Sequence, residues 1–301
     1  MGRLFSVAGK ILYIRKTHRS IITVFIAAHF VLAAIVNLVF FAGNAFRPLA
    51  SATGGLFTGS LLVNVAFIGV LVGWVILKRG RLRLYDVGAI LSHLPMGIIY
   101  TIGFWGVAQV VHLIFSLLTY GTVTLNPEWV NNSSFMIGLI LTQVIGNALF
   151  EEIAYRGFLF PQLYLKLDGW RHRPWLRLGA AILFSQGLFA LSHIPNRLYL
   201  GMSISQIAPD LLLLLGWGIL YTLIYLRTDN LFLVVGVHAL GNAPSTLFAT
   251  SPVFEGGGAS LFMYAIVVLL LFGVPMLRAY GQRFHLGLDY GTQARERRDY
   301  V

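Results

Sequence analysis

Long apolar runs separated by short polar segments dominate the chain. Several runs approach or exceed the ~20 residues that a helix needs to cross a bilayer. The third run is overlong, and we expect its start to lie in the membrane interface before Pro95 turns the chain inward. The pattern predicts about eight membrane-spanning helices, at residues 21–43, 58–77, 88–118, 134–160, 176–195, 208–226, 229–249 and 259–277.

Composition supports this class. The chain is 57% hydrophobic and only 11% charged, whereas a soluble domain carries roughly 25% charged residues. We therefore predict an all-α fold, a polytopic transmembrane bundle that forms a single integral membrane domain over residues 1–301. The sequence contains no cysteine, which excludes a disulfide framework, a thiolate metal site and a cysteine nucleophile.

Basic residues gather in short clusters between the apolar runs. They occupy the tail 1–20, the loops "KRGRLR" and "KLDGWRHRPWLR", and the tail 279–301, while the alternate loops are nearly free of them. Basic loops stay on the cytoplasmic side, so we expect an even number of spans and cytoplasmic termini. Topology explains the net charge of +11 better than nucleic acid does. We expect a lipid bilayer as partner, no nucleic acid, and a multi-pass protein of a prokaryotic plasma membrane.

Of the eleven acidic residues, only Glu151 and Glu152 lie deep in a predicted span. A carboxylate at the centre of a bilayer costs about 3 kcal/mol, so such residues face a polar interior. Glu152 and Arg156 are four residues apart, in the favourable order for an ion pair along a helix. A structural pair explains these two residues but not Glu151, which projects about 100° away around the helix.

Three further polar residues lie deep in later spans. His193 occurs in "LFALSHIPN", and His238 and Asn242 are one helical turn apart in "VHALGNAP". Each histidine stands near a proline or asparagine that breaks or polarises its helix, which membranes tolerate where the break lines a cavity. We therefore expect a water-filled pocket among the fourth, fifth and seventh spans. Hydrogen bonds that pack helices are the expected role of His29, His93 and His112.

Three short motifs occur one after another along the chain. "EEIAYR" fits E-E-x-x-x-R, "FALSH" fits F-x-x-x-H from Phe189 to His193, and "HALGN" fits H-x-x-x-N. Together they resemble the signature of the CAAX protease and bacteriocin-processing family of intramembrane glutamic endopeptidases, which includes the type II CAAX prenyl endopeptidases. The resemblance covers residues 134–250, which we take as the catalytic core.

This resemblance implies a role for each glutamate. Glu151, with His193, would activate a water molecule that attacks a peptide carbonyl. Glu152 and its charge partner Arg156 would hold the helix in place, and Phe189 would support them. Activated water is also the nucleophile that the residues favour, because the chain has no cysteine and no serine in a G-x-S-x-G setting.

The resemblance also implies that His238 and Asn242 stabilise the oxyanion. The expected substrate is a peptide or protein, with membrane-anchored and prenylated chains among the options, and no cofactor is expected. One alternative is a zinc-dependent protease that uses Glu151, His193 and His238 as ligands, although no H-E-x-x-H is present. Another is a carrier or scaffold that uses the glutamates as a proton or ion site.

Overall fold

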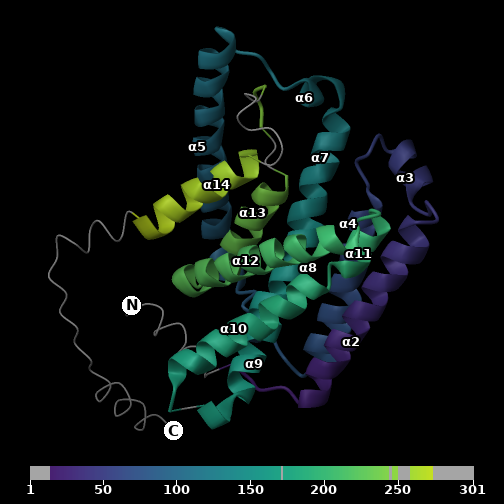
Figure 1. Ribbon diagram of the computed structural model, residues 1–301, viewed down its shortest axis with the longest axis vertical. Helices are drawn as coiled ribbons and strands as arrows, with labels where there is room; N and C mark the ends of the chain where they lie inside the picture. Colours follow the sequence, from purple (N-terminus) through teal and green to yellow (C-terminus); the bar gives the residue numbers. More distant parts are fainter. Residues whose placement is uncertain (1–13, 171, 244–245, 250–257, 274–301) are drawn as a thin grey trace, which may run out of the picture.

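A computed structural model describes residues 14–170, 172–243, 246–249 and 258–273. Beyond one isolated bridge between Leu125 and Phe248, these residues contain no β-structure, and the all-α prediction is confirmed (Figure 1). The first half of the chain forms α2 (Arg19–Ile35), η1 (Val36–Phe41), α3 (Arg47–Ala52), α4 (Gly59–Phe67), η2 (Ile68–Arg79), η3 (Tyr85–Val87), η4 (Leu91–His93), α5 (Leu94–Tyr120) and α6 (Pro127–Asn131).

The second half carries the motifs. It forms α7 (Ser133–Leu141), η5 (Thr142–Asn147), α8 (Ala148–Glu151), η6 (Glu152–Leu159), α9 (Phe160–Lys166), η7 (Asp168–Trp170), α10 (Pro174–Leu191), α11 (Ile194–Tyr199), α12 (Ile204–Thr228), α13 (Leu231–Asn242), α14 (Gly258–Val268) and η9 (Leu269–Gly273). The elements η1, η2, η5, η6 and η9 are π-helical continuations of α-helices, whereas η3, η4 and η7 are short 3₁₀ turns.

Six continuous helical segments in the described residues are long and apolar enough to cross a membrane. They correspond to the first six predicted spans, at Arg19–Phe41, Gly59–Arg79, Leu91–Tyr120, Ser133–Lys166, Pro174–Tyr199 and Ile204–Thr228. The chain is therefore an integral, multi-pass membrane protein. Before α5, the segments Tyr85–Val87 and Leu91–His93 form two short 3₁₀ turns, and Pro95 stands in the first turn of α5. The interfacial location expected for this stretch stays a prediction.

The seventh predicted span differs from its expected length. Its helix, α13, has 12 residues, or ~18 Å at the α-helical rise of 1.5 Å per residue, which is short of the ~30 Å hydrocarbon core. The eighth is described only as α14 and η9, up to Gly273. Pro244, residues 1–13 and the tail 279–301 lie outside the described residues, so the count of eight spans and the cytoplasmic termini stay predictions.

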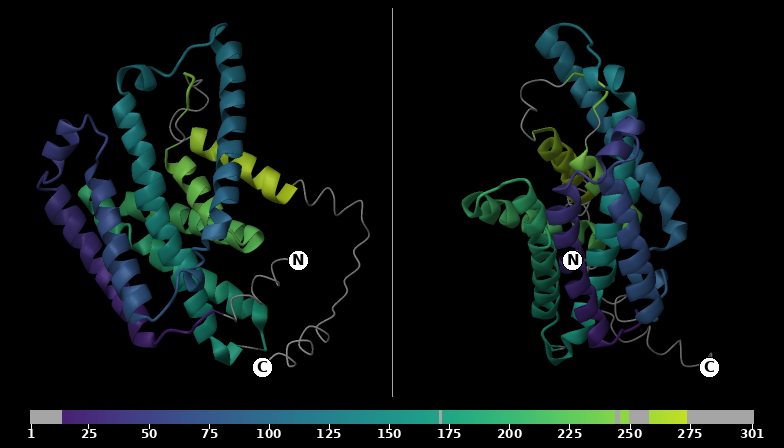
Figure 2. Two further views of the ribbon diagram at one scale, coloured as in Figure 1. Left: turned by 180° about the vertical axis from the view of Figure 1, so that it is seen from behind. Right: turned by 90° about the vertical axis from the view of Figure 1, so that its right-hand side faces the viewer.

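The helix that carries the glutamates runs through the centre of the bundle. Every residue of η6 is buried, and the segment contacts α10, α12, α13, η2 and η3. Figure 2 shows α2 and the α4–η2 helix side by side at one flank, where they pack against each other. Gly157 permits a close approach between η6 and η3, because a Cβ there would overlap the carbonyl oxygen of Val87 in η3. Glu151 and Glu152 are thus fixed from several sides.

Candidate active site

A cavity of about 830 Å³ opens inside the bundle, beside α8. Side chains from α2, η1, α4, α7, η5, α8, α10, α11, α12, α13 and α14 line it, so its wall involves more segments than the three spans that the sequence indicates. Its size falls within the ~300–1,000 Å³ typical of ligand pockets. The lining includes Glu151, Phe189, His193, His238 and Asn242. The structure therefore brings these five predicted residues to one cavity.

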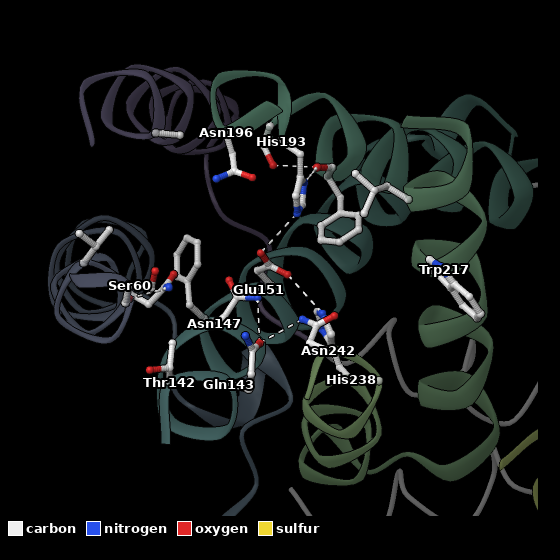
Figure 3. A pocket seen from close by; sticks show the side chains of 18 of the residues that line it. Ser60, Thr142, Gln143, Asn147, Glu151, His193, Asn196, Trp217, His238 and Asn242 are labelled. Atoms are coloured by element: carbon white, nitrogen blue, oxygen red, sulfur yellow. Dashed lines mark hydrogen bonds and ion pairs between the residues drawn. The ribbon is translucent and has the colours of Figure 1, made fainter. Parts of the chain in front are cut away.

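Glu151 projects into this cavity between two histidines (Figure 3). Its Oε1 lies 3.7 Å from His193 Nε2, and its Oε2 lies 3.6 Å from His238 Nε2. Both separations exceed the 2.7–3.2 Å of a direct N–H···O hydrogen bond. Polar atoms at such distances are commonly bridged by water. The arrangement can therefore hold a small polar molecule against the carboxylate.

The other ring nitrogen of each histidine is held by a fixed acceptor. His193 Nδ1 donates to the carbonyl oxygen of Phe189 at 2.9 Å. His238 Nδ1 donates to Glu152 Oε1 at 2.7 Å. A carbonyl or a carboxylate oxygen can only accept, so Nδ1 carries the proton in both rings. In the neutral imidazoles both Nε2 atoms are then acceptors, and both face Glu151.

Glu152 is buried in an ion pair with Arg156 and does not line the cavity. Its Oε1 lies 3.0 Å from Arg156 Nη1, and both side chains are 0% exposed. The Arg156 guanidinium lies over the ring of Phe189 at 4.3 Å and over that of Tyr221 at 5.2 Å, within cation–π range. Phe189 thus contributes twice, because its ring covers Arg156 and its carbonyl oxygen orients His193.

Asn242 is held by Gln143 of η5, which the sequence argument missed. Gln143 Oε1 accepts hydrogen bonds from Asn242 Nδ2 at 3.0 Å and from Asn147 Nδ2 at 3.4 Å. Figure 3 shows Gln143 between the two asparagines. A signal was available, because Gln143, Asn147 and Glu151 are spaced by four residues and project from one helix face. The amide of Asn242 therefore keeps one N–H for the cavity.

Tyrosines complete the surroundings of the histidines. Tyr221 stacks on His238 with ring centroids 4.5 Å apart, and its hydroxyl bonds that of Tyr264. His29 lines the cavity, and its Nδ1 lies 2.8 Å from the hydroxyl of Tyr155, which is the packing hydrogen bond expected from its sequence context. The rings limit the ways in which His238 can reorient.

Among the residues that the structure describes, no group of three or more His, Asp or Glu side chains is arranged to hold a metal ion, and the chain has no cysteine. The zinc alternative at Glu151, His193 and His238 stays a prediction.

The helices and the cavity around Glu151 define a multi-pass membrane protein with a candidate hydrolytic site. Residues 132–244 match the protein family described as type II CAAX prenyl endopeptidase Rce1-like. The match extends from α7 to α13 and contains every motif residue, which confirms the resemblance to the CAAX protease family of membrane proteases. No match was found among curated proteins or among solved structures.

The buried pair generates a stability prediction. Glu152→Gln leaves the Arg156 cation buried without a counter-charge, which typically destabilises a protein by about 3–5 kcal/mol. We expect a clearly lower melting temperature for the purified protein in detergent. Glu152→Gln/Arg156→Met removes both charges and should recover part of that loss. A Glu152→Gln protein that melts like the wild type would show that the pair does not hold the bundle together.

Proposed function

We propose that this chain is an intramembrane endopeptidase that hydrolyses a peptide bond with water activated by Glu151 and His193. The observation that supports this most is that His193 and His238 flank the Glu151 carboxylate inside the cavity. Both Glu151 carboxylate oxygens face an Nε2 atom, at 3.6 and 3.7 Å. Water is a suitable ligand between the Glu151 carboxylate and His193 Nε2. It can donate one proton to each of these acceptors and keeps an oxygen lone pair for attack.

The proposed reaction begins with a water that donates to Glu151 and to His193 Nε2. As the water oxygen bonds to the peptide carbonyl carbon, one water proton passes to the Glu151 carboxylate, which acts as general base. The carbonyl oxygen becomes the oxyanion of a tetrahedral intermediate. Collapse of the intermediate breaks the C–N bond, and the proton held by Glu151 passes to the leaving amine. The products are a new carboxyl and a new amino terminus.

Asn242 is the proposed donor to the oxyanion. Its amide carries two N–H groups, and one of them is committed to Gln143 at 3.0 Å. That bond orients the second N–H without a need for reorganisation during the reaction, which is the condition for strong oxyanion stabilisation. His238 is proposed to assist Asn242 through Nε2, the ring nitrogen that remains toward the cavity because Nδ1 is committed to Glu152. This role requires a proton on Nε2.

Membrane-anchored peptides are the proposed substrates. The CAAX protease family acts on peptide or protein substrates in the membrane, and here the cavity is set among helices with exposed apolar side chains on their outer surfaces. A tethered peptide reaches such a site by lateral diffusion in the bilayer. Paired peptides with and without a prenyl chain, presented to the enzyme in proteoliposomes, would show whether a prenyl group is required.

The role of Glu151 is tested by Glu151→Gln, which removes the base and nearly preserves the shape. General base catalysis contributes about 100- to 10,000-fold, so we expect turnover to fall by at least 100-fold while the melting temperature stays near that of the wild type. Comparative peptidomics of membranes containing either protein supplies the readout, because it detects cleavage of any peptide in the membrane. Identical peptide profiles would contradict the proposed activity, and near-full turnover on an identified substrate would contradict the base.

Asn242→Ala tests the oxyanion role. Loss of one such donor typically lowers kcat by about 100- to 1,000-fold, and we expect KM to change by only several-fold because the charge develops in the transition state. The competing explanation is that Asn242 merely links α13 to η5 through Gln143. In that case the variant would melt at lower temperature and the folded fraction would keep its kcat, so both quantities should be measured on one sample.

The metal-independent mechanism makes a separate prediction. A strong chelator should leave the activity of the purified enzyme unchanged, because the proposed steps use only side chains and water. Metal analysis of the same preparation should find less than stoichiometric zinc. Activity that is lost on chelation and restored by added zinc would support the alternative in which Glu151, His193 and His238 bind the metal.

A further inference from the structure

A second polar pocket lies outside the catalytic cavity, where α2 begins and η2 ends. Its volume is about 590 Å³, and its lining includes the basic residues Arg15, Lys16, His18, Arg79 and Arg81. We call these five residues and the space between them the basic pocket. None of them belongs to a motif of the protease family, and the pocket lies outside the matched residues 132–244.

The positive charge of the basic pocket is largely uncompensated. Lys16 pairs with Asp168 at 3.0 Å. In the described part of the chain, Arg15, Arg79 and Arg81 make no ion pair through their side chains. Three guanidinium groups are therefore available to an anion.

The carboxylate of Asp86 near the pocket is already committed to the backbone. Asp86 accepts hydrogen bonds from the backbone N–H of Arg15 at 3.1 Å and from that of Arg83 at 2.8 Å. It therefore fixes the course of two loops and makes no bond to a guanidinium of the basic pocket.

Buried hydrogen bonds hold the two basic segments together despite their like charge. Thr17 donates through Oγ1 to the carbonyl oxygen of Gly80 at 3.1 Å and through its backbone N–H to Gln162 Oε1 at 3.0 Å. Gln162 Nε2 donates in turn to the carbonyl oxygen of Arg15 at 2.8 Å. Arg81 adopts a left-handed backbone conformation with φ of 53°, which is unfavourable for a residue with a side chain. The fold thus assembles the cationic lining from segments distant in sequence.

We infer that the pocket lies near the level where lipid headgroups meet the hydrocarbon. The membrane-spanning segment Gly59–Arg79 ends at the pocket. Trp74, which is 51% exposed, stands one to two turns earlier, and the guanidinium of Arg79 lies 5.6 Å from the centroid of its ring. Tryptophan is enriched at membrane interfaces. Below this level, Val24 of α2 and Val70 of η2 expose apolar surface.

We propose that the basic pocket binds the phosphate of an anionic phospholipid whose acyl chains lie along the exposed faces of α2 and η2. Guanidinium groups match phosphate oxygens in paired hydrogen bonds and are favoured for phosphate recognition. A lipid satisfies the charge of the pocket and the adjoining apolar surface together, whereas a soluble anion satisfies only the first. Basic pockets between membrane helices are known to recognise anionic headgroups in this way. The proposal is independent of the proposed proteolytic activity.

The test uses the purified full chain in a neutral detergent. Phosphatidylglycerol or phosphatidylcholine is added, the melting temperature is recorded, and native mass spectrometry counts bound lipids. We expect phosphatidylglycerol to raise the melting temperature and to remain bound, and phosphatidylcholine to do neither. In Arg79→Gln/Arg81→Gln the affinity for phosphatidylglycerol should fall roughly 30-fold, at about a fivefold loss for each basic residue near a membrane surface.

A matched control is available in the same stretch of chain, at the end of η2 and just after it. Lys78→Gln/Arg83→Gln removes the same charge from exposed positions that do not line the pocket, and it should bind phosphatidylglycerol like the wild type. Arg15→Gln changes the other side of the pocket and should also weaken binding, which keeps the proposal testable if the Arg79/Arg81 variant does not fold. Equal losses in the pocket and control variants would indicate diffuse attraction and overturn the proposal.

Inorganic phosphate and glycerophosphoglycerol, the headgroup without chains, form the last arm. We expect neither to raise the melting temperature at concentrations where phosphatidylglycerol does so. An equal rise would assign the pocket to a soluble anion and overturn the lipid proposal. An equal rise in melting temperature with phosphatidylcholine would show that the pocket does not recognise the negative charge of the headgroup. That result would also overturn the lipid proposal.

Discussion

A buried charge that must be neutralised inside the membrane organises the centre of this protein. Glu152 and Arg156 are fully buried and lie 3.0 Å apart. Removing two ions from water is expensive, and their attraction offsets this only with good geometry and further hydrogen bonds. One further hydrogen bond comes from His238 of α13, which donates to Glu152, and the ring of Phe189 of α10 covers Arg156. The three motif-bearing segments therefore meet around one ion pair.

The adjacent glutamates lie in different surroundings, because neighbouring helical residues project about 100° apart. Glu152 turns into the core and is 0% exposed, while Glu151 lines the cavity. His238 connects them, with Nδ1 on Glu152 and Nε2 toward Glu151. The structural carboxylate thus orients the ring that faces the proposed general base. This hydrogen bond links the stability role proposed for Glu152 to the chemical role proposed for Glu151.

Segments outside the family match contribute to both pockets. Asn37 of η1 and Asn64 of α4 line the same cavity as Glu151, and α2 packs on the central helix through Phe25 and Phe158. At the end of the bundle, Thr17 and Gln162 join the N-terminal segment to α9. The first two membrane segments therefore support the site that the motifs define, and they add the basic pocket.

Much of the architecture is local and could be predicted from the sequence. Run lengths fix helices, because a bilayer requires each backbone group to bond within its own segment. The rarity of charge in these runs singled out Glu151 and Glu152, and a spacing of four residues predicted the partner of Glu152. The spacing of Gln143 and Glu151 by eight residues also predicts that they share one face of the helix.

Only the tertiary structure decided which distant faces meet. It placed His193 and His238 on either side of Glu151, gave His238 a bond to Glu152, and linked Asn242 to Gln143. It also showed that α13 has 12 residues, too few for a full span. Periodicity assigns a side chain to a face of its own helix, but packing among many apolar faces of similar character selects the neighbour. The partners of these polar residues are therefore settled by the assembled bundle.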